Sequence, residues 1–170
     1  MTSRSLIIRH LTCQETLKMP KVVISDTSCL IILTKIKELD LLRQLYKTVT
    51  ITQDILLEYG EQLPDWIEVQ QAKDHYRQQL LEMQIDKGEA SAIALALETN
   101  ENIIILDDWK ARKLADRLGL SVTGTLGVMI KAKNNGIIPS IKPYLDKIRK
   151  TNFRFSEELE HTALKEANEK

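Results

Sequence analysis

The sequence has few of the residues that build disulfide frameworks, zinc centres and membrane spans. Its two cysteines, Cys13 and Cys29, give neither a disulfide framework nor a zinc-binding spacing, and its three histidines are scattered. No apolar run approaches the roughly 18 residues that a membrane helix needs. Aromatic residues make up only 5%, so stacking platforms for single-stranded bases are expected to be sparse. We therefore expect a cytoplasmic protein without a membrane-spanning segment.

The sequence also lacks a net charge of either sign, although its charges are unevenly distributed. Lysine and arginine total 24, as do aspartate and glutamate, which excludes a histone-like blanket of positive charge. Residues 54–106 contain eleven acidic and three basic side chains, whereas residues 107–154 contain four acidic and eleven basic ones. This distribution is compatible with a cation site beside a polyanion, and equally with solvated helix faces that happen to cluster.

From residue 21 onward, short β-branched runs alternate with longer helical patterns. Because each predicted strand is followed by a helix, we expect an α/β fold with a central, mainly parallel sheet and helices on both faces. Residues 21–170 then form a single domain, and residues 1–20 are either a mobile N-terminal extension or an upstream start that the cell does not use. Residues 65–69 are an edge strand or an exposed loop. Strands are predicted at 22–25, 49–51, 102–106 and 120–123, and helices at 29–35, 38–46, 53–59, 74–83, 88–99, 109–118, 126–134 and 140–150, with a final helix near 153–160 closing the core.

Carboxylates follow the two most apolar predicted strands. Asp26 comes after the strand at 22–25, and Asp107 and Asp108 come after the strand at 102–106. Ligands of open parallel sheets bind beyond the carboxyl ends of the strands, so we expect these acids to lie close together. Asp108 also fits the N-cap of the helix at 109–118, and Ser28 fits the N-cap of the first helix. This assignment leaves Asp26 and Asp107 without a structural task.

Two glutamates extend the set of candidate acids. Ile51, Ile55 and Glu58 are spaced i, i+4, i+7, so Glu58 lies on or beside the apolar face of its helix. A carboxylate there needs a partner, which is a metal ion, Arg112 or a lysine. Glu89 stands three residues after Asp86 and completes a capping box, a structural task that by itself explains the residue.

An all-oxygen set of acids predicts the kind of ion that would hold it together. The carboxylates repel one another, and their oxygens favour Mg²⁺ or Mn²⁺ over zinc. Such an ion orients a water, lowers its pKa and stabilises the leaving oxygen of a phosphodiester. Basic residues in the helix at 109–118 are candidates for contacts with a phosphate backbone, although several are equally explained as solvated surface. The acids are Asp26, Glu58, Glu89 and Asp107, and the basic residues are Lys110, Arg112, Lys113 and Arg117.

Four stretches of the chain stand out together, namely VVISDTS at 22–28, GEASAIALA at 88–96, IILDDWKAR at 104–112 and VTGTLGV at 122–128. They resemble the PIN-domain nucleases, in particular the DUF3368 branch that is grouped with VapC-like toxins. The resemblance implies a three-layer α/β/α sandwich and a metal-dependent endoribonuclease that acts on RNA. It also implies a homodimer inhibited by a small antitoxin protein encoded nearby. The family's acids map onto Asp26, Glu58, Glu89 and Asp107, with Asp108 as a fifth, and Ser28 helps to order the site or to hold a metal-bound water.

Two positions depart from the family's pattern. Cys29 stands where the branch usually has proline, and Glu89 stands where most PIN nucleases have aspartate. The sequence thus predicts a Mg²⁺- or Mn²⁺-dependent endoribonuclease that acts as the toxin of a toxin–antitoxin pair. The alternative is a PIN fold that binds RNA or a protein without cutting. A phosphohydrolase would need a second aspartate where Ser28 stands, and a receiver domain would need an acidic pair at the first strand.

Overall fold

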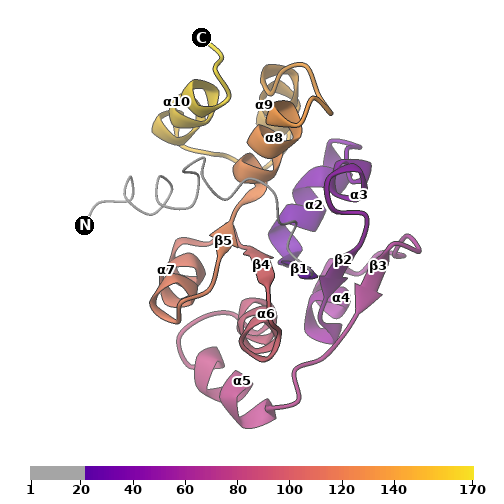
Figure 1. The fold of residues 1–170 in the computed structure, drawn as a ribbon, viewed down its shortest axis with the longest axis vertical. Coiled ribbons are helices and arrows are strands. Elements are labelled where there is room, and N and C mark those ends of the chain that lie inside the picture. Colours follow the sequence, from indigo (N-terminus) through magenta and orange to yellow (C-terminus); the bar gives the residue numbers. More distant parts are fainter. Residues whose placement is uncertain (1–21) are drawn as a thin grey trace.

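The computed structural model describes residues 22–170, and the N-terminal extension expected at residues 1–20 lies outside this range. Five parallel strands form one central sheet in the order β3-β2-β1-β4-β5. Figure 1 shows this sheet between two groups of helices, which is the expected three-layer α/β/α arrangement. The strands are β1 (Val22–Ser25), β2 (Val49–Ile51), β3 (Ile67–Val69), β4 (Asn102–Ile105) and β5 (Val122–Thr123).

The burial of the strands explains why their sequences differ. The central strands β1, β2 and β4 are covered on both faces and consist of apolar or β-branched runs. Residues 67–69 form an edge strand rather than an exposed loop, with Ile67 buried and Val69 exposed. The strand predicted at 120–123 is shorter than expected, because only Val122 and Thr123 pair with β4.

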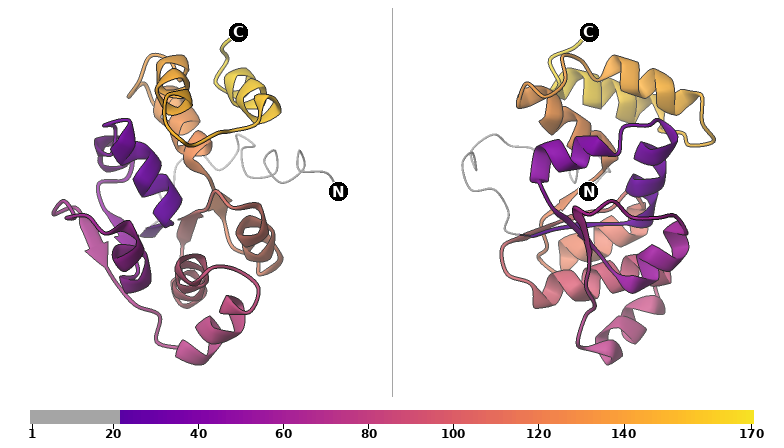
Figure 2. Two further views of the ribbon diagram at one scale, coloured as in Figure 1. Left: turned by 180° about the vertical axis from the view of Figure 1, so that it is seen from behind. Right: turned by 90° about the vertical axis from the view of Figure 1, so that its right-hand side faces the viewer.

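Helices cover both faces of the sheet. In Figure 2, α3 and the group α8–α10 lie over one face, while α4, α6 and α7 lie over the other, with α5 outermost against α6. The predicted final helix is present as α10, which buries Ala163 and packs against α8. No helix in residues 22–170 combines the length and apolar character needed to cross a bilayer. The helices are α2 (Thr27–Lys35), α3 (Asp40–Tyr46), α4 (Gln53–Tyr59), α5 (His75–Glu82), α6 (Lys87–Glu98), α7 (Trp109–Arg117), α8 (Thr125–Asn134), α9 (Lys142–Arg149) and α10 (Glu157–Glu166).

Helix α6 packs more tightly into the protein than the other helices on its face. Its residues Ala90, Ala92 and Ala94 are fully buried, and it contacts α4, α5, α7 and the strands β1 and β4. Small side chains permit this close approach because they keep the helix axis near its neighbours. The first turn of α6, which carries Gly88 and Glu89, is therefore held beside the carboxyl ends of the central strands.

The helix caps agree with the sequence at Thr52 and Asp108 and differ from it at the first helix. Thr52 accepts a hydrogen bond from the Ile55 N–H at the start of α4, and Asp108 accepts one from the Ala111 N–H at the start of α7, as predicted. The prediction that Ser28 caps the first helix was wrong. Asp26 has the extended backbone of a cap residue and accepts from the Cys29 N–H at 2.8 Å, so α2 begins at Thr27.

Candidate active site

Asp26 joins the end of strand β4 to the start of helix α2. Ser25 pairs with Ile105 in the sheet, so the residues that follow both strands emerge at the same edge. One carboxylate oxygen of Asp26 accepts the Cys29 N–H, and the other accepts the Asp107 N–H at 2.9 Å. The side chain is only 2% exposed. Asp26 therefore has a structural task, contrary to the sequence-based expectation.

Asp107 is held by the first residue of helix α8. Its Oδ1 accepts the backbone N–H of Thr125 at 2.8 Å, and its Oδ2 accepts the Thr125 hydroxyl at 2.5 Å. Gly124 makes this approach possible, because a Cβ there would lie 2.7 Å from Nη1 of Arg112 and 2.9 Å from Oδ1 of Asp107. The sequence analysis did not single out Thr125, although the signal is visible in the Gly124-Thr125 pair that follows a short strand.

Burial and mutual repulsion disfavour the ionised forms of the two aspartates. Burial raises the pKa of Asp26 well above its ordinary value, and the charges of Asp107 and Glu89 raise it further, while the hydrogen bonds from Cys29 and Asp107 act the other way. Burial also raises the pKa of Asp107, against the hydrogen bonds from Thr125 and the charge of Arg112. A cation placed between the two carboxylates would relieve both effects.

Glu89 lies at the first turn of α6, within electrostatic reach of the other acids. Burial raises its pKa to about 7, and the charges of Asp108, Asp86 and Glu58 act in the same direction. The N–H of Asp86 donates to the Glu89 carboxylate and lowers its pKa, which is one half of the expected capping box. The other half is absent, because the Asp86 side chain makes no capping hydrogen bond. Glu89 therefore accepts the Asp86 N–H and still interacts electrostatically with Asp26, Asp108 and Glu58.

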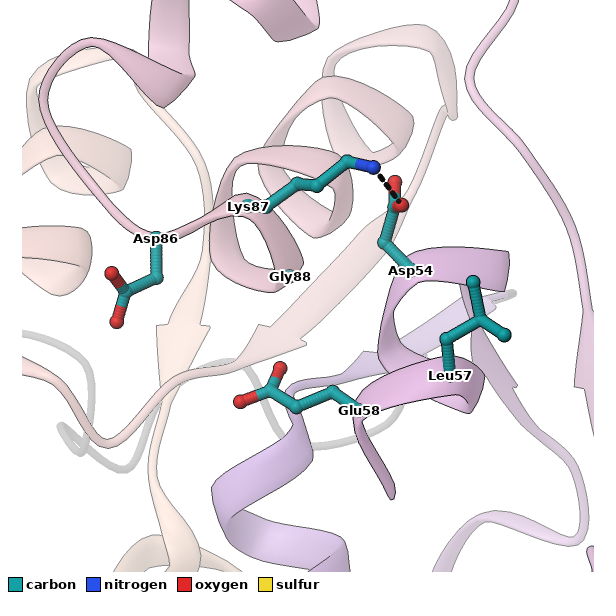
Figure 3. A pocket seen from close by; sticks show the side chains of 6 residues that line it. All are labelled: Asp54, Leu57, Glu58, Asp86, Lys87 and Gly88. Carbon is teal, nitrogen blue, oxygen red and sulfur yellow. Dashed lines mark ion pairs between the residues drawn. The ribbon is translucent and has the colours of Figure 1, made fainter. Parts of the chain in front are cut away.

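Glu58 is exposed rather than set in the apolar face of α4. Its Oε2 accepts the hydroxyl of Thr27 at 2.7 Å, and among residues 22–170 the partner of Glu58 is this hydroxyl rather than Arg112 or a lysine. Gly88 leaves the space that this carboxylate occupies, since a Cβ at that position would lie 2.6 Å from Oε2. Figure 3 shows Glu58 beside Gly88 in an open pocket of about 280 Å³, with Lys87 turned away to pair with Asp54 at 2.9 Å.

The remaining predicted site residues lie on α2 and α7. Ser28 is half-buried in the first turn of α2, next to Asp26. Lys110, Lys113 and Arg117 are exposed on α7, the helix that Asp108 caps. Arg112 differs from them, because it is directed inward and its Nη1 donates to the Leu106 carbonyl at 2.7 Å. It thereby anchors the segment that leads into Asp107.

The acidic side chains of the site fit a divalent cation through two carboxylates rather than through a closed cage. Within residues 22–170, no group of three or more acidic, histidine or cysteine side chains is arranged closely enough to enclose an ion. Mg²⁺, however, commonly binds through one or two carboxylates and completes its shell with waters and substrate phosphates. Asp26 and Asp107 offer two carboxylates that interact electrostatically, and their oxygens retain lone pairs beyond the hydrogen bonds they accept. The residues present therefore fit a hard divalent ion held mainly by this pair.

Comparison with known proteins gives one match. The family model DUF3368, described as a PIN domain, matches residues 22–169. No curated protein matches the chain, and no solved structure matches it. The matched range covers all the strands and helices described above.

Proposed function

The chain belongs to the PIN-domain family DUF3368, and from this membership we propose that it is a Mg²⁺- or Mn²⁺-dependent endoribonuclease. A PIN domain indicates a nuclease-type, hydrolytic function. The observation that carries the finer proposal is the hydrogen bond from the Asp107 N–H to the Asp26 carboxylate, which joins two acids that follow neighbouring strands at one edge of the sheet. With Glu89 they form an acidic group, in which the charges of Asp107 and Glu89 both raise the pKa of Asp26.

Each residue of the site has a part in this proposal. Asp26 and Asp107 hold the cation, Glu89 and Glu58 add negative charge at its open side, and Asp108 and Ser28 border the site. A divalent ion bound there supplies an activated water and neutralises charge on the phosphate. Thr125 and Arg112 act as positioning residues, since Thr125 fixes the Asp107 carboxylate and Arg112 fixes the Leu106 carbonyl.

Helix α7 provides the contacts to the RNA backbone in this proposal. It begins directly after Asp107 and Asp108, and its exposed residues Lys110, Lys113 and Arg117 form a positive surface. Such side chains position a nucleic acid through its phosphates without reading its sequence. Arg112 is left out of this role because it is hydrogen-bonded inside the protein.

The proposal extends to a toxin of a toxin–antitoxin pair that acts in the cytoplasm as a homodimer. The resemblance to VapC-like proteins supports a small antitoxin as partner. A further support is the surface formed by α5 and the residue that follows it, where Tyr76, Leu80 and Met83 are exposed and spaced i, i+4, i+7. Large apolar side chains on one helix face are typical of a surface that contacts another protein.

Cleavage of a mixed RNA pool tests the proposed activity. Purified protein is incubated with Mg²⁺, Mn²⁺ or EDTA, together with the variants Asp26→Asn and Asp107→Asn. Asp146→Asn is the matched control, because it makes the same change on the surface of α9. The proposal is supported if cleavage needs the metal, is lost in both site variants and persists in the control. Intact RNA under every condition, from folded protein free of a co-purified inhibitor, overturns it.

The second candidate is a PIN fold that binds RNA or a protein without cutting. The inward-facing Arg112 favours it, because its positive charge already lowers the pKa of Asp107 and partly replaces a metal ion. This candidate predicts RNA binding that EDTA and Asp26→Asn leave unchanged. The same protein preparations, assayed for binding as well as for cleavage, distinguish the two functions.

A further inference from the structure

An open pocket of about 600 Å³ lies beside the acidic group, between the start of α6 and the start of α7. Asp86 and Glu89 contribute carboxylates to its lining, and Trp109 and Lys110 contribute the first turn of α7. Met83, just after α5, also lines it. Glu89 thus belongs both to this pocket and to the acidic group, so a ligand in the pocket would sit next to the proposed cleavage site.

The apolar part of the pocket is unusually exposed. Trp109 is 43% exposed and Met83 is 81% exposed, although both are large apolar side chains. A half-exposed indole in a pocket wall offers a flat surface on which a planar ring can stack. Trp109 is also only two residues after Asp107, so a base stacked on it would belong to a nucleotide close to the carboxylates.

The polar part of the pocket selects for hydrogen-bond donors. Asp86 makes no capping bond to its own helix, and Figure 3 shows its carboxylate pointing away from Lys87 and Asp54. An ionised carboxylate only accepts hydrogen bonds. Guanine presents two neighbouring N–H donors, N1–H and the N2 amino group, which match the two oxygens of one carboxylate. Adenine and cytosine offer one donor beside an acceptor, and uracil offers one donor between two acceptors.

We propose that this pocket binds a guanine base of single-stranded RNA, stacked on Trp109 and hydrogen-bonded through its Watson–Crick edge to Asp86. The inference rests on the proposed function, since it makes the pocket the subsite that selects the nucleotide next to the cleaved bond. Lys110 at the pocket wall offsets the negative charge that an RNA phosphate meets there. The sparse aromatic content of the chain does not oppose this role, because one exposed tryptophan is sufficient for one base.

Binding in EDTA tests the inference separately from catalysis. Labelled short oligouridine is compared with the same oligonucleotide carrying one central guanosine, adenosine or cytidine, and fluorescence anisotropy reports the affinity. We expect the guanosine oligonucleotide to bind about tenfold more tightly than the all-uridine one, as for a bidentate base contact. Asp86→Asn and Trp109→Ala remove this preference, Trp109→Phe retains part of it, and Leu118→Ala, at the other end of α7, leaves it intact.

The outcomes separate the subsite from the activity. Equal affinity for all four oligonucleotides, or a guanosine preference that survives in both Asp86→Asn and Trp109→Ala, overturns the subsite even if RNA is cleaved. A preference that depends on Asp86 and Trp109 supports the subsite even if RNA is never cleaved, in which case the proposed nuclease fails alone. If the protein does cleave, Trp109→Ala is expected to relax the guanosine requirement at the cut positions.

Discussion

The backbone N–H of Asp107 donates to the carboxylate of Asp26 across 2.9 Å, although the two residues are 81 positions apart in the chain. The same carboxylate receives the N–H of Cys29 at the start of α2. One buried side chain thus closes the end of β4, begins a helix and stands in the proposed metal site. Different substitutions of Asp26 can therefore separate its structural role from its proposed role in metal binding.

Replacement of Asp26 by alanine should destabilise the protein more than replacement by asparagine. Asp26→Ala removes the cap of α2 and leaves the Asp107 N–H without an acceptor, which together cost about 2–4 kcal/mol. Asp26→Asn keeps one oxygen acceptor and relieves the repulsion with Asp107, so its cost should be about 1 kcal/mol or less. Urea unfolding measures both variants. An exposed cap provides the control, since Asp108→Ala should cost about 1 kcal/mol. Equal costs for the two Asp26 variants would contradict the role of the Asp26 oxygens as acceptors for Cys29 and Asp107.

Divalent metal ions should stabilise the wild-type protein against unfolding. A ligand that binds only the folded state at a hundredfold excess over its Kd adds about 2.7 kcal/mol. We expect Mg²⁺ or Mn²⁺ to raise the melting temperature of the wild type and of Asp146→Asn. Neither ion should do so for Asp26→Asn or Asp107→Asn, which lose half of the carboxylate pair. The measurement is thermal unfolding with metal or EDTA, and a wild type insensitive to both ions would remove the basis for the metal site.

The stability of the metal-free protein should depend on pH through Glu89. The folded-state pKa of about 7 lies above the ordinary value of 4.5, so the folded protein binds the proton more tightly than the unfolded chain does. The contribution of Glu89 to stability therefore falls as the pH rises from 4.5 to 7 and changes no further above that range. Glu89→Gln should remove this part of the pH dependence. Because Glu89 is only half-buried, Glu89→Gln should raise the free energy of unfolding above pH 7 by only about 1 kcal/mol.

Urea midpoints in EDTA, measured below 4.5 and above 7 for the wild type and for Glu89→Gln, check this expectation. Glu98→Gln is the control, because hydrogen bonds from the N–H groups of Lys73 and Asp74 lower the pKa of Glu98. That variant should lose stability at neutral pH instead of gaining it. A Glu89→Gln protein less stable than the wild type above pH 7 would show that the capping bond outweighs the repulsion.

Two glycine substitutions should separate the site from the fold. At Gly88 an added Cβ would meet the flexible end of Glu58, and alanine also improves the helix by up to about 1 kcal/mol. Gly88→Ala should therefore leave stability unchanged or improved, while it displaces Glu58 and reduces RNA cleavage. At Gly124 the Cβ would meet Arg112 and Asp107, both held by hydrogen bonds, so Gly124→Ala should cost about 1–3 kcal/mol. Urea unfolding and cleavage rates are measured in parallel for the two variants. A Gly88→Ala protein that loses stability as well as cleavage would contradict this separation of site and fold.

The exposed basic residues of α7 should contribute to RNA binding in a salt-dependent way. Lys113→Ala and Arg117→Ala should each weaken binding for all sequences and reduce the slope of log K against log salt by about one phosphate contact. Lys142→Ala, on α9 over the opposite face of the sheet, is the control. Affinities measured over a series of salt concentrations give the slopes. Equal slopes of log K against log salt for all three variants would show that the RNA does not contact Lys113 and Arg117.

The local features of the fold were predictable because each depends on neighbouring residues. The strands at 22–25, 49–51 and 102–105 are apolar runs bounded by polar residues, and the caps at Thr52 and Asp108 are polar side chains that precede helical patterns. The parallel sheet followed from the alternation of strands and helices. The sequence analysis expected Asp26 and Asp107 to lie close together, since both follow central strands.

Two features depended on contacts between distant segments. The choice of Asp26 over Ser28 as the cap of α2 depends on where β1 ends beside β4, because the Asp107 N–H binds the second oxygen of Asp26. The position of the Glu58 carboxylate depends on two residues that are distant in the sequence. Gly88 leaves the space that it occupies, and the Thr27 hydroxyl donates a hydrogen bond to it.

The sequence by itself determined the α/β class, most of the helix and strand positions and the set of acids, because periodicity, capping and strand ends are local properties. Only the tertiary structure decided that Arg112 faces inward, because Leu106 and Asp107 supply a carbonyl and a charge that an exposed helix face lacks. It also decided that Trp109 stays exposed beside Asp86 and Glu89, because the approach of α6 to α7 forms the pocket.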